Sequence, residues 1–169
     1  MPLLCISLLA LLLLPPSLSC NSTRPASEII KDYIIVQVDL NNTRSTVTTL
    51  LKNSQTTCQD YHLPNCTAQG VNLVRTLSTL SCKMRHLGLP LTDRLTEFVL
   101  YSTRCSCERP TKEPKVKLKR TETGQRRNEQ RRINRKLCRA KAMLSNMTEC
   151  YQILKVQSVT HVRPNSSTA

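Results

Sequence analysis

Aromatic residues and glycine are scarce in this chain of 169 residues, which has no tryptophan, one phenylalanine, four tyrosines and three glycines. Proteins that bind single-stranded nucleic acid stack the bases on aromatic side chains, so we do not expect a nucleic-acid partner. The sequence also lacks a glycine-rich phosphate loop, a nucleophile-and-base set and a paired metal-ligand spacing. We therefore expect neither an enzyme nor a protein that holds a metal or cofactor.

Long apolar runs are absent after the N-terminus, so we expect no membrane insertion. Residues 1–19 carry no charged side chain, and their apolar run is broken by Pro15-Pro16, which leaves it too short to span a bilayer. The run is followed by Ser17-Leu18-Ser19, whose small residues suit a cleavage site. We expect residues 1–19 to be a secretory signal peptide and residues 20–169 to form one extracellular domain.

The cysteines indicate disulfides. Nine are present, and Cys5 leaves with the predicted signal peptide. The zinc alternative is weak because no Cys-x-x-Cys pair occurs and the three histidines have no paired ligand spacing. An even number of cysteines in an oxidising compartment favours disulfides, each worth about 2–4 kcal/mol. The eight expected disulfide cysteines are Cys20, Cys58, Cys66, Cys82, Cys105, Cys107, Cys138 and Cys150.

Five N-glycosylation sequons agree with export from the cell. Their asparagines are Asn21, Asn41, Asn65, Asn146 and Asn165. We expect these to be acceptor sites without requiring that all five carry a glycan. Asn65 stands directly before a cysteine that we expect to be bridged.

Acidic residues are few, with 11 Asp and Glu against 25 Lys and Arg, and the excess charge is concentrated near the C-terminus. A positive field of this density attracts polyanions, which outside the cell are sulfated glycosaminoglycans such as heparan sulfate. The alternatives are a solvated face that aids solubility and a processing site at one of the Arg-Arg pairs. The expected heparin-binding residues are Lys115, Lys117, Lys119, Arg120, Arg126, Arg127, Arg131 and Arg132.

Four segments show helical periodicity. The clearest is predicted over about residues 125–156, where apolar side chains recur in steps of three and four from Ile133 to Leu154. Arginines at 127, 131, 135 and 139 step by four around its other side. A second helix has an apolar stripe from Leu73 to Leu87 and stops at Gly88. A third is predicted to begin at Thr92 or Asp93 and to end before Cys105, with Leu95, Phe98 and Val99 pointing inward.

The first segment, from about residue 27 to residue 52, is ambiguous. Its two ends have helical spacing, but residues 35–40 alternate apolar and polar side chains and include β-branched residues, which favours a strand. We predict a helix, because tertiary packing often overrides local propensity.

The predicted connections are long, short and long. Long connections permit crossovers and short ones make antiparallel neighbours. The expected fold class is therefore all-α: an up-up-down-down four-helix bundle with two long crossover loops, linked by disulfides. We expect the basic crossover at about residues 108–124 and a disordered tail at about residues 158–169. The alternative is a loose all-helical domain.

The last predicted helix contains a specific motif. A segment rich in charged residues begins at Asn128 and precedes Leu137-Cys138. Eleven residues separate Cys138 from the sequence Cys150-Tyr-Gln-Ile-Leu-Lys155. This pattern resembles the C-terminal helix of the interleukin-7 family. The resemblance implies bridges from Cys58 to Cys138, from Cys66 to Cys150, and from Cys20 to either Cys105 or Cys107. Cys82 and the remaining member of Cys105-Ser-Cys107 have no counterpart there and are left for a fourth bridge.

The same resemblance implies a monomeric cytokine that bridges a private alpha receptor chain and a shared gamma chain, and so signals lymphocyte survival and proliferation. In the family the alpha chain contacts helices one and three, and the gamma chain contacts helices one and four. It points to Leu95, Thr96, Val99 and Thr103 for the alpha chain, and to Tyr151 for the gamma chain. Core roles for Leu95, Val99 and Tyr151 remain open. Alternative functions are a cytokine of the interleukin-4 and interleukin-13 branch or a cationic antimicrobial protein.

Overall fold

The computed structural model describes residues 24–67, 72–107 and 122–160. In these ranges the chain forms four α-helices and a short 3-10 helix and has no strand. The elements are α2 (Ala26–Asn53), α3 (Leu73–Arg85), η1 (Pro90–Thr92), α4 (Asp93–Thr103) and α5 (Glu122–Thr160). The predictions for residues 1–19, Cys20, Asn21, Lys115, Lys117, Lys119, Arg120 and Asn165 fall outside the described residues.

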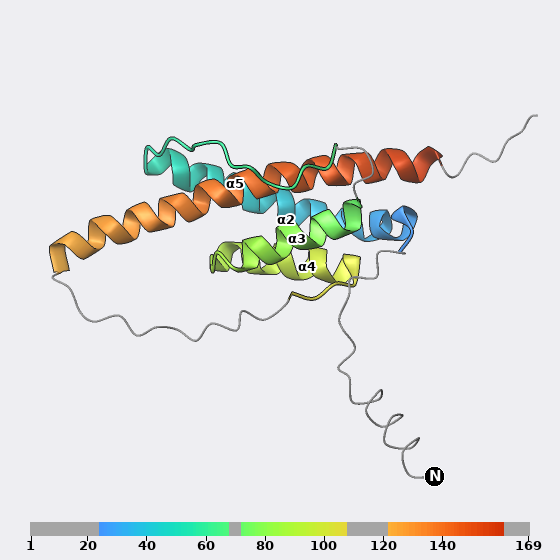
Figure 1. Ribbon diagram of the computed structural model, residues 1–169, viewed down its shortest axis with the longest axis horizontal. Helices are drawn as coiled ribbons and strands as arrows, with labels where there is room; N and C mark the ends of the chain where they lie inside the picture. Colours follow the sequence, from blue (N-terminus) through green and yellow to red (C-terminus); the bar gives the residue numbers. More distant parts are fainter. Residues whose placement is uncertain (1–23, 68–71, 108–121, 161–169) are drawn as a thin grey trace, which may run out of the picture.

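The four helices share one core. α2 packs against α4 and α5, while α3 packs against the same two helices. Figure 1 shows α5 along one side of the molecule with α2 beside it and α3 and α4 beneath. None of the described helices combines the length and apolar character that crossing a bilayer requires.

α2 is a continuous helix through residues 35–40, so the strand alternative is wrong. Its buried side chains recur with helical spacing and point toward the core: Ile29, Val36, Leu40, Thr43, Val47 and Leu51. Burial of this stripe outweighs the strand preference of the β-branched residues between them. Because the stripe runs through Val36 and Leu40, the neighbouring Ile34, Ile35 and Val38 are left exposed on the outside.

α3 and α4 match their predicted stripes. The Asn72 side chain caps α3 by accepting a hydrogen bond of 3.0 Å from the Arg75 amide. Leu73, Leu77, Leu80 and Met84 are buried as predicted. The chain turns at Gly88, whose φ of +59° lies in the left-handed region that favours glycine.

α5 is longer than predicted. It begins at Glu122 and ends at Thr160, so residues 122–124 of the expected crossover and 158–160 of the expected disordered tail are helical. Its buried stripe starts only at Leu137, whereas the side chains of residues 126–132 are all exposed. In Figure 1 this basic part extends beyond α3 and α4.

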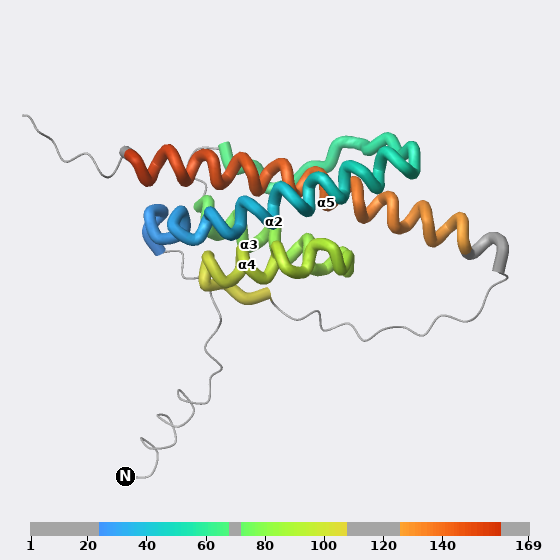
Figure 2. Tube along the Cα trace, turned by 180° about the vertical axis from the view of Figure 1, so that it is seen from behind, coloured from blue at the N-terminus to red at the C-terminus, as the bar shows by residue number. Residues whose placement is uncertain are grey.

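Disulfides tie the structure together at three described pairs. They are Cys58–Cys138, Cys66–Cys150 and Cys82–Cys107, with Cα–Cα distances of 5.4, 5.2 and 5.4 Å. The first two fasten the segment after α2 to α5, and Figure 2 shows that segment running beside α5. Cys105 is also disulfide-bonded. Because Cys107 pairs with Cys82, Cys105 is the remaining candidate for the predicted bridge to Cys20.

Candidate functional site

The side chains that the resemblance assigned to receptor contacts lie in the core. Leu95, Thr96, Val99, Thr103 and Tyr151 are each at most 1% exposed. The hydroxyls of Thr96 and Thr103 donate hydrogen bonds to carbonyls of their own helix, at Asp93 and Val99. A side chain without exposed surface cannot touch a partner directly. Leu95, Val99 and Tyr151 therefore have the core role that was left open for them, and the expectation of direct receptor contact is corrected for all five residues.

The exposed side of α4 carries a different row. Arg94, Phe98 and Tyr101 are spaced by four and three residues, which places them on one side of a helix. The Arg94 guanidinium carbon lies 5.5 Å from the centroid of the Phe98 ring, a cation–π distance. Phe98 is half-buried, but the Tyr101 side chain is 77% exposed.

α2 presents a matching row where it packs against α4. Asp32, Ile35 and Asp39 are spaced by three and four residues. Asp39 Oδ2 lies 3.3 Å from Arg94 Nε of α4, an electrostatic contact without hydrogen-bond geometry. Ile35, between the two carboxylates in this row, is 57% exposed. We call the two rows together the α2–α4 seam, formed by Asp32, Ile35, Asp39, Arg94, Phe98 and Tyr101.

Arg24 anchors one end of the seam. Its guanidinium lies 3.0 Å from Glu28 and 3.2 Å from Asp32, and it donates a hydrogen bond to the Ser102 carbonyl at the end of α4. Burial acts to lower the pKa of Arg24, but the hydrogen bonds and charges of the two carboxylates outweigh it and raise the pKa. The hydrogen bond from Arg24 lowers the pKa of Glu28. The start of α2 is thus held to the end of α4 by charged groups.

A cleft of about 450 Å³ opens at this end of the seam. Its lining combines both charge signs with an apolar ring: Arg24, Asp32, Glu97, Tyr101 and Arg104. Outside the seam, Ile34 and Val38 add exposed apolar surface to α2, at 73% and 57%. The arrangement offers an apolar and aromatic centre with charged groups around it, which suits protein recognition.

The predicted basic site is only partly described. Arg126, Arg127, Arg131 and Arg132 are exposed on the first turns of α5. Arg132 lies 3.0 Å from Glu129 on the same helix, which reduces its charge toward a ligand. Two open clefts of about 430 and 380 Å³ lie further along α5, beside residues 56–63.

The described sequons differ in exposure. Asn41 is exposed on α2. Asn65 is also exposed, and its Oδ1 accepts hydrogen bonds from the Thr67 amide at 2.9 Å and hydroxyl at 2.7 Å. Asn146 is half-buried, and its Nδ2 donates a hydrogen bond of 3.0 Å to the Pro64 carbonyl. Asn146 therefore fastens the disulfide-linked segment to α5.

The seam was missed by sequence reasoning, although a signal for it exists. Arg94, Phe98 and Tyr101 repeat the i, i+4, i+7 spacing one position away from the core stripe of Leu95, Val99 and Ser102. An aromatic residue on the polar side of a helix is the clue to such a surface.

No protein family, curated protein or solved structure matches this chain.

Proposed function

We propose that this protein is a secreted cytokine, similar to the interleukin-7 family, that bridges a private alpha receptor chain and a shared gamma chain to promote lymphocyte survival and proliferation. Two features support the proposal: the disulfide-linked all-α bundle and the Leu-Cys to Cys-Tyr-Gln-Ile-Leu motif on α5. A monomer of this kind needs two separate exposed surfaces, one for each receptor chain.

We also infer the up-up-down-down topology with two long crossovers. The N-terminal end of α2 (blue) and the C-terminal end of α5 (red) lie at the same end of the molecule in both views, which supports antiparallel packing of these helices. The short connection between α3 and α4 supports an antiparallel second pair. Most of the proposed second crossover, residues 108–121, lies outside the described ranges.

The α2–α4 seam is the observation that carries the receptor proposal. Ile34, Ile35 and Val38 form a contiguous apolar group on an outer helix face, and Tyr101 adds an exposed ring across the seam on α4. Soluble monomers expose such groups mainly where they bind partners. The alpha chain of the family contacts helices one and three, which correspond to α2 and α4 here. We therefore place the alpha-chain contact at the seam.

For the gamma chain we propose the outer side of α5 near its C-terminus. Gln152, Val156 and Val159 are exposed and spaced by four and three residues, so they share one side of the helix. Tyr151, on the same helix, is buried in the core. Its role in this proposal is to hold α5 against α2 rather than to touch the receptor.

Heparan sulfate binding is the second proposed activity. It is supported by the excess of 25 basic over 11 acidic residues and by Arg126, Arg127 and Arg131, which are exposed and form no ion pair within the described residues. Binding to sulfated chains would keep the cytokine near the cells that secrete it.

The test replaces seam residues and measures receptor binding. Ile35→Ser with Tyr101→Ala should weaken binding to the soluble alpha-chain ectodomain by about 2–4 kcal/mol, because central aromatic and apolar anchors dominate interfaces. Leu50→Ser is the matched control, since Leu50 is an exposed apolar residue on the same helix but away from the seam. Equal binding by the seam variant and the control would refute the alpha-chain site.

The competing functions give different results in the same assays. A cationic antimicrobial protein would permeabilise anionic vesicles at micromolar concentration without any receptor, and the seam substitutions would leave that activity unchanged. A cytokine of the interleukin-4 and interleukin-13 branch would instead bind the private receptor chain of that branch. Proliferation of lymphocytes that carry both receptor chains, lost when either chain is blocked, is the result expected from our proposal.

A further inference from the structure

A row of arginines runs along α5 on the side that faces residues 56–63. Arg131, Arg135 and Arg139 recur every four residues, so they lie on one side of the helix and span about 12 Å. All three are exposed, and within the described residues none of them forms an ion pair. The positive charge of the row is therefore not neutralised by any acidic side chain in the described part of the chain.

The segment that follows α2 forms the opposite wall. It is fixed to α5 by the Cys58–Cys138 disulfide and by a hydrogen bond of 2.6 Å that Asn134 Nδ2 donates to Thr56 Oγ1. The cleft of about 430 Å³ lies between this wall and the arginine row. Its lining includes Thr56, Thr57, Gln59, Arg131, Asn134 and Arg135.

A second cleft, of about 380 Å³, continues from the first. Tyr61 lines both clefts, and the Arg139 guanidinium carbon lies 5.7 Å from the centroid of its ring. The second cleft is also lined by Lys83 of α3, by His86 directly after α3, and by His62 of the loop that follows α2. We call the two clefts together the α5 trough. Both of its clefts are open to solvent.

The chemistry of the lining selects the ligand. Among the described residues no carboxylate lines either cleft, although Asp60 stands exposed in the loop nearby. Guanidinium groups bind sulfate and phosphate with paired hydrogen bonds, and the hydroxyls and amides of the first cleft suit the hydroxyls of a sugar. Among the described lining residues Tyr61 is the only Phe, Tyr or Trp, and Arg139 lies over its ring, which leaves little aromatic surface on which nucleic-acid bases could stack.

We propose that the α5 trough is the binding site for a sulfated glycosaminoglycan, with the chain lying along Arg131, Arg135 and Arg139 and ending beside Lys83. This inference rests on the proposed binding of heparan sulfate and makes it specific. The sulfated chain is held by a walled site that the Cys58–Cys138 disulfide shapes. The exposed Arg126 and Arg127 contribute only to the general field.

The first test measures how salt weakens binding of the mature, disulfide-bonded protein to heparin. For a linear polyelectrolyte, the slope of log affinity against log salt falls by about one for each contacting charge removed. Arg135→Ser with Arg139→Ser should therefore lower the slope by about two. Arg44→Ser with Arg75→Ser is the matched control, because it removes the same charge from exposed positions outside the trough. The control should leave the slope nearly unchanged.

Each result has a definite meaning. Equal slopes for the trough variant and the control would show that net charge alone attracts heparin, and would overturn the trough. If the slope fell only in the double variant Arg126→Ser with Arg127→Ser, the proposed site in the trough would be wrong, while the proposal that the protein binds heparan sulfate would stand. Failure of the unmodified protein to bind heparin at physiological salt would refute the proposed binding itself.

The second test uses the unmodified chain and so does not depend on variant folding. Lysine acetylation is followed by mass spectrometry with and without a heparin oligosaccharide. We expect labelling of Lys83 to be lost in the complex, while labelling of the exposed Lys52 on α2 persists. Unchanged labelling of Lys83 would place the sulfated chain elsewhere. Equal protection by polyglutamate or by single-stranded DNA would show that the trough accepts any polyanion, and would overturn its assignment to sulfated sugars.

Discussion

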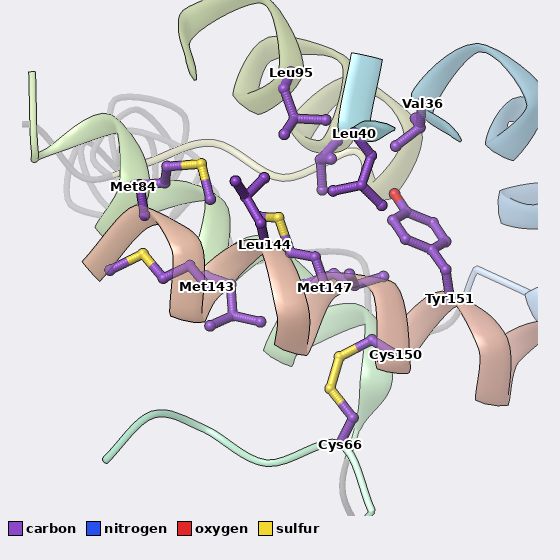
Figure 3. Packing of buried hydrophobic residues seen from close by; sticks show 14 of the residues in the cluster. Val36, Leu40, Cys66, Met84, Leu95, Met143, Leu144, Met147, Cys150 and Tyr151 are labelled. Carbon is purple, nitrogen blue, oxygen red and sulfur yellow. A yellow bond between two sulfur atoms is a disulfide. The ribbon is translucent and has the colours of Figure 1, made fainter. Parts of the chain in front are cut away.

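The ring of Tyr151 on α5 stacks on the ring of Tyr33 on α2, with centroids 4.6 Å apart and an interplanar angle of 26°. Tyr151 has no exposed surface, and within the described residues its hydroxyl has no hydrogen-bond partner. Figure 3 shows this hydroxyl directed toward Val36 and Leu40. The aromatic residue after the last cysteine of α5 therefore joins two helices inside the core.

Two substitutions of Tyr151 distinguish the contribution of its ring to stability from the contribution of its hydroxyl. Tyr151→Phe removes a buried polar atom that has no partner and should raise the free energy of unfolding by about 1 kcal/mol. Tyr151→Ala removes the stacked ring and should lower it by about 3–5 kcal/mol. Urea denaturation followed by circular dichroism measures both. If Tyr151→Phe abolished receptor binding without loss of stability, the hydroxyl would have a direct functional role and the core assignment would fail.

Stability should fall at alkaline pH because of the same residue. Burial raises the pKa of the Tyr151 phenol above the ordinary value of 10.0, and the nearby Ser102 hydroxyl opposes this only in part. The unfolded chain therefore releases this proton at lower pH than the folded chain, so stability is full below about pH 10 and decreases above it.

Tyr151→Phe is the control for this pH dependence. Burial also raises the pKa of Tyr33, so this variant should keep part of the decline. Unfolding free energies measured between pH 8 and pH 11 should diverge for the two proteins above about pH 10, by at most about 1.4 kcal/mol per pH unit. Parallel curves for the two proteins would contradict the prediction.

The sequons at Asn65 and Asn146 should differ in occupancy. The Asn65 side chain is exposed, whereas Asn146 Nδ2 donates to the Pro64 carbonyl beneath the Cys66–Cys150 disulfide, where a glycan would displace the segment. When the chain is expressed through a secretory pathway, Thr67→Ala should lower its mass by one glycan. Thr148→Ala should change the mass only by the difference between threonine and alanine. Intact mass spectrometry before and after glycan release measures the glycan mass on each variant. A glycan found on Asn146 would require the loop to dock differently.

The disulfides should contribute unequally to stability. Cys58 and Cys138 are 80 residues apart, whereas Cys82 and Cys107 are 25 apart, and the longer loop restricts the unfolded chain more. Replacing both cysteines by alanine should cost about 4–5 kcal/mol for the first pair and about 3–4 kcal/mol for the second. Guanidinium denaturation of the two variants tests the order. Peptide mapping without reduction should recover both pairs from the unmodified protein.

Periodicity in the sequence determined the helices whose apolar residues form one clear stripe. The stripe from Leu73 to Met84 and the one from Leu137 to Leu154 are both buried, because spacing alone places these side chains on one side of a helix. The even number of cysteines after residue 19 indicated disulfides, and three described pairs are present. These features are local or compositional, so the sequence sufficed to predict them.

Tertiary structure decided which of two neighbouring faces points inward. Residues 34–38 of α2 have apolar side chains on several sides, and only packing against α4 and α5 buries Val36 while it leaves Ile34, Ile35 and Val38 outside. The same holds on α4, where Leu95 and Val99 are buried and Tyr101 is exposed. The α5 trough likewise exists only because a disulfide brings Cys58 to Cys138 across 80 residues. Contacts of this range depend on the position of a second element, which no local pattern encodes.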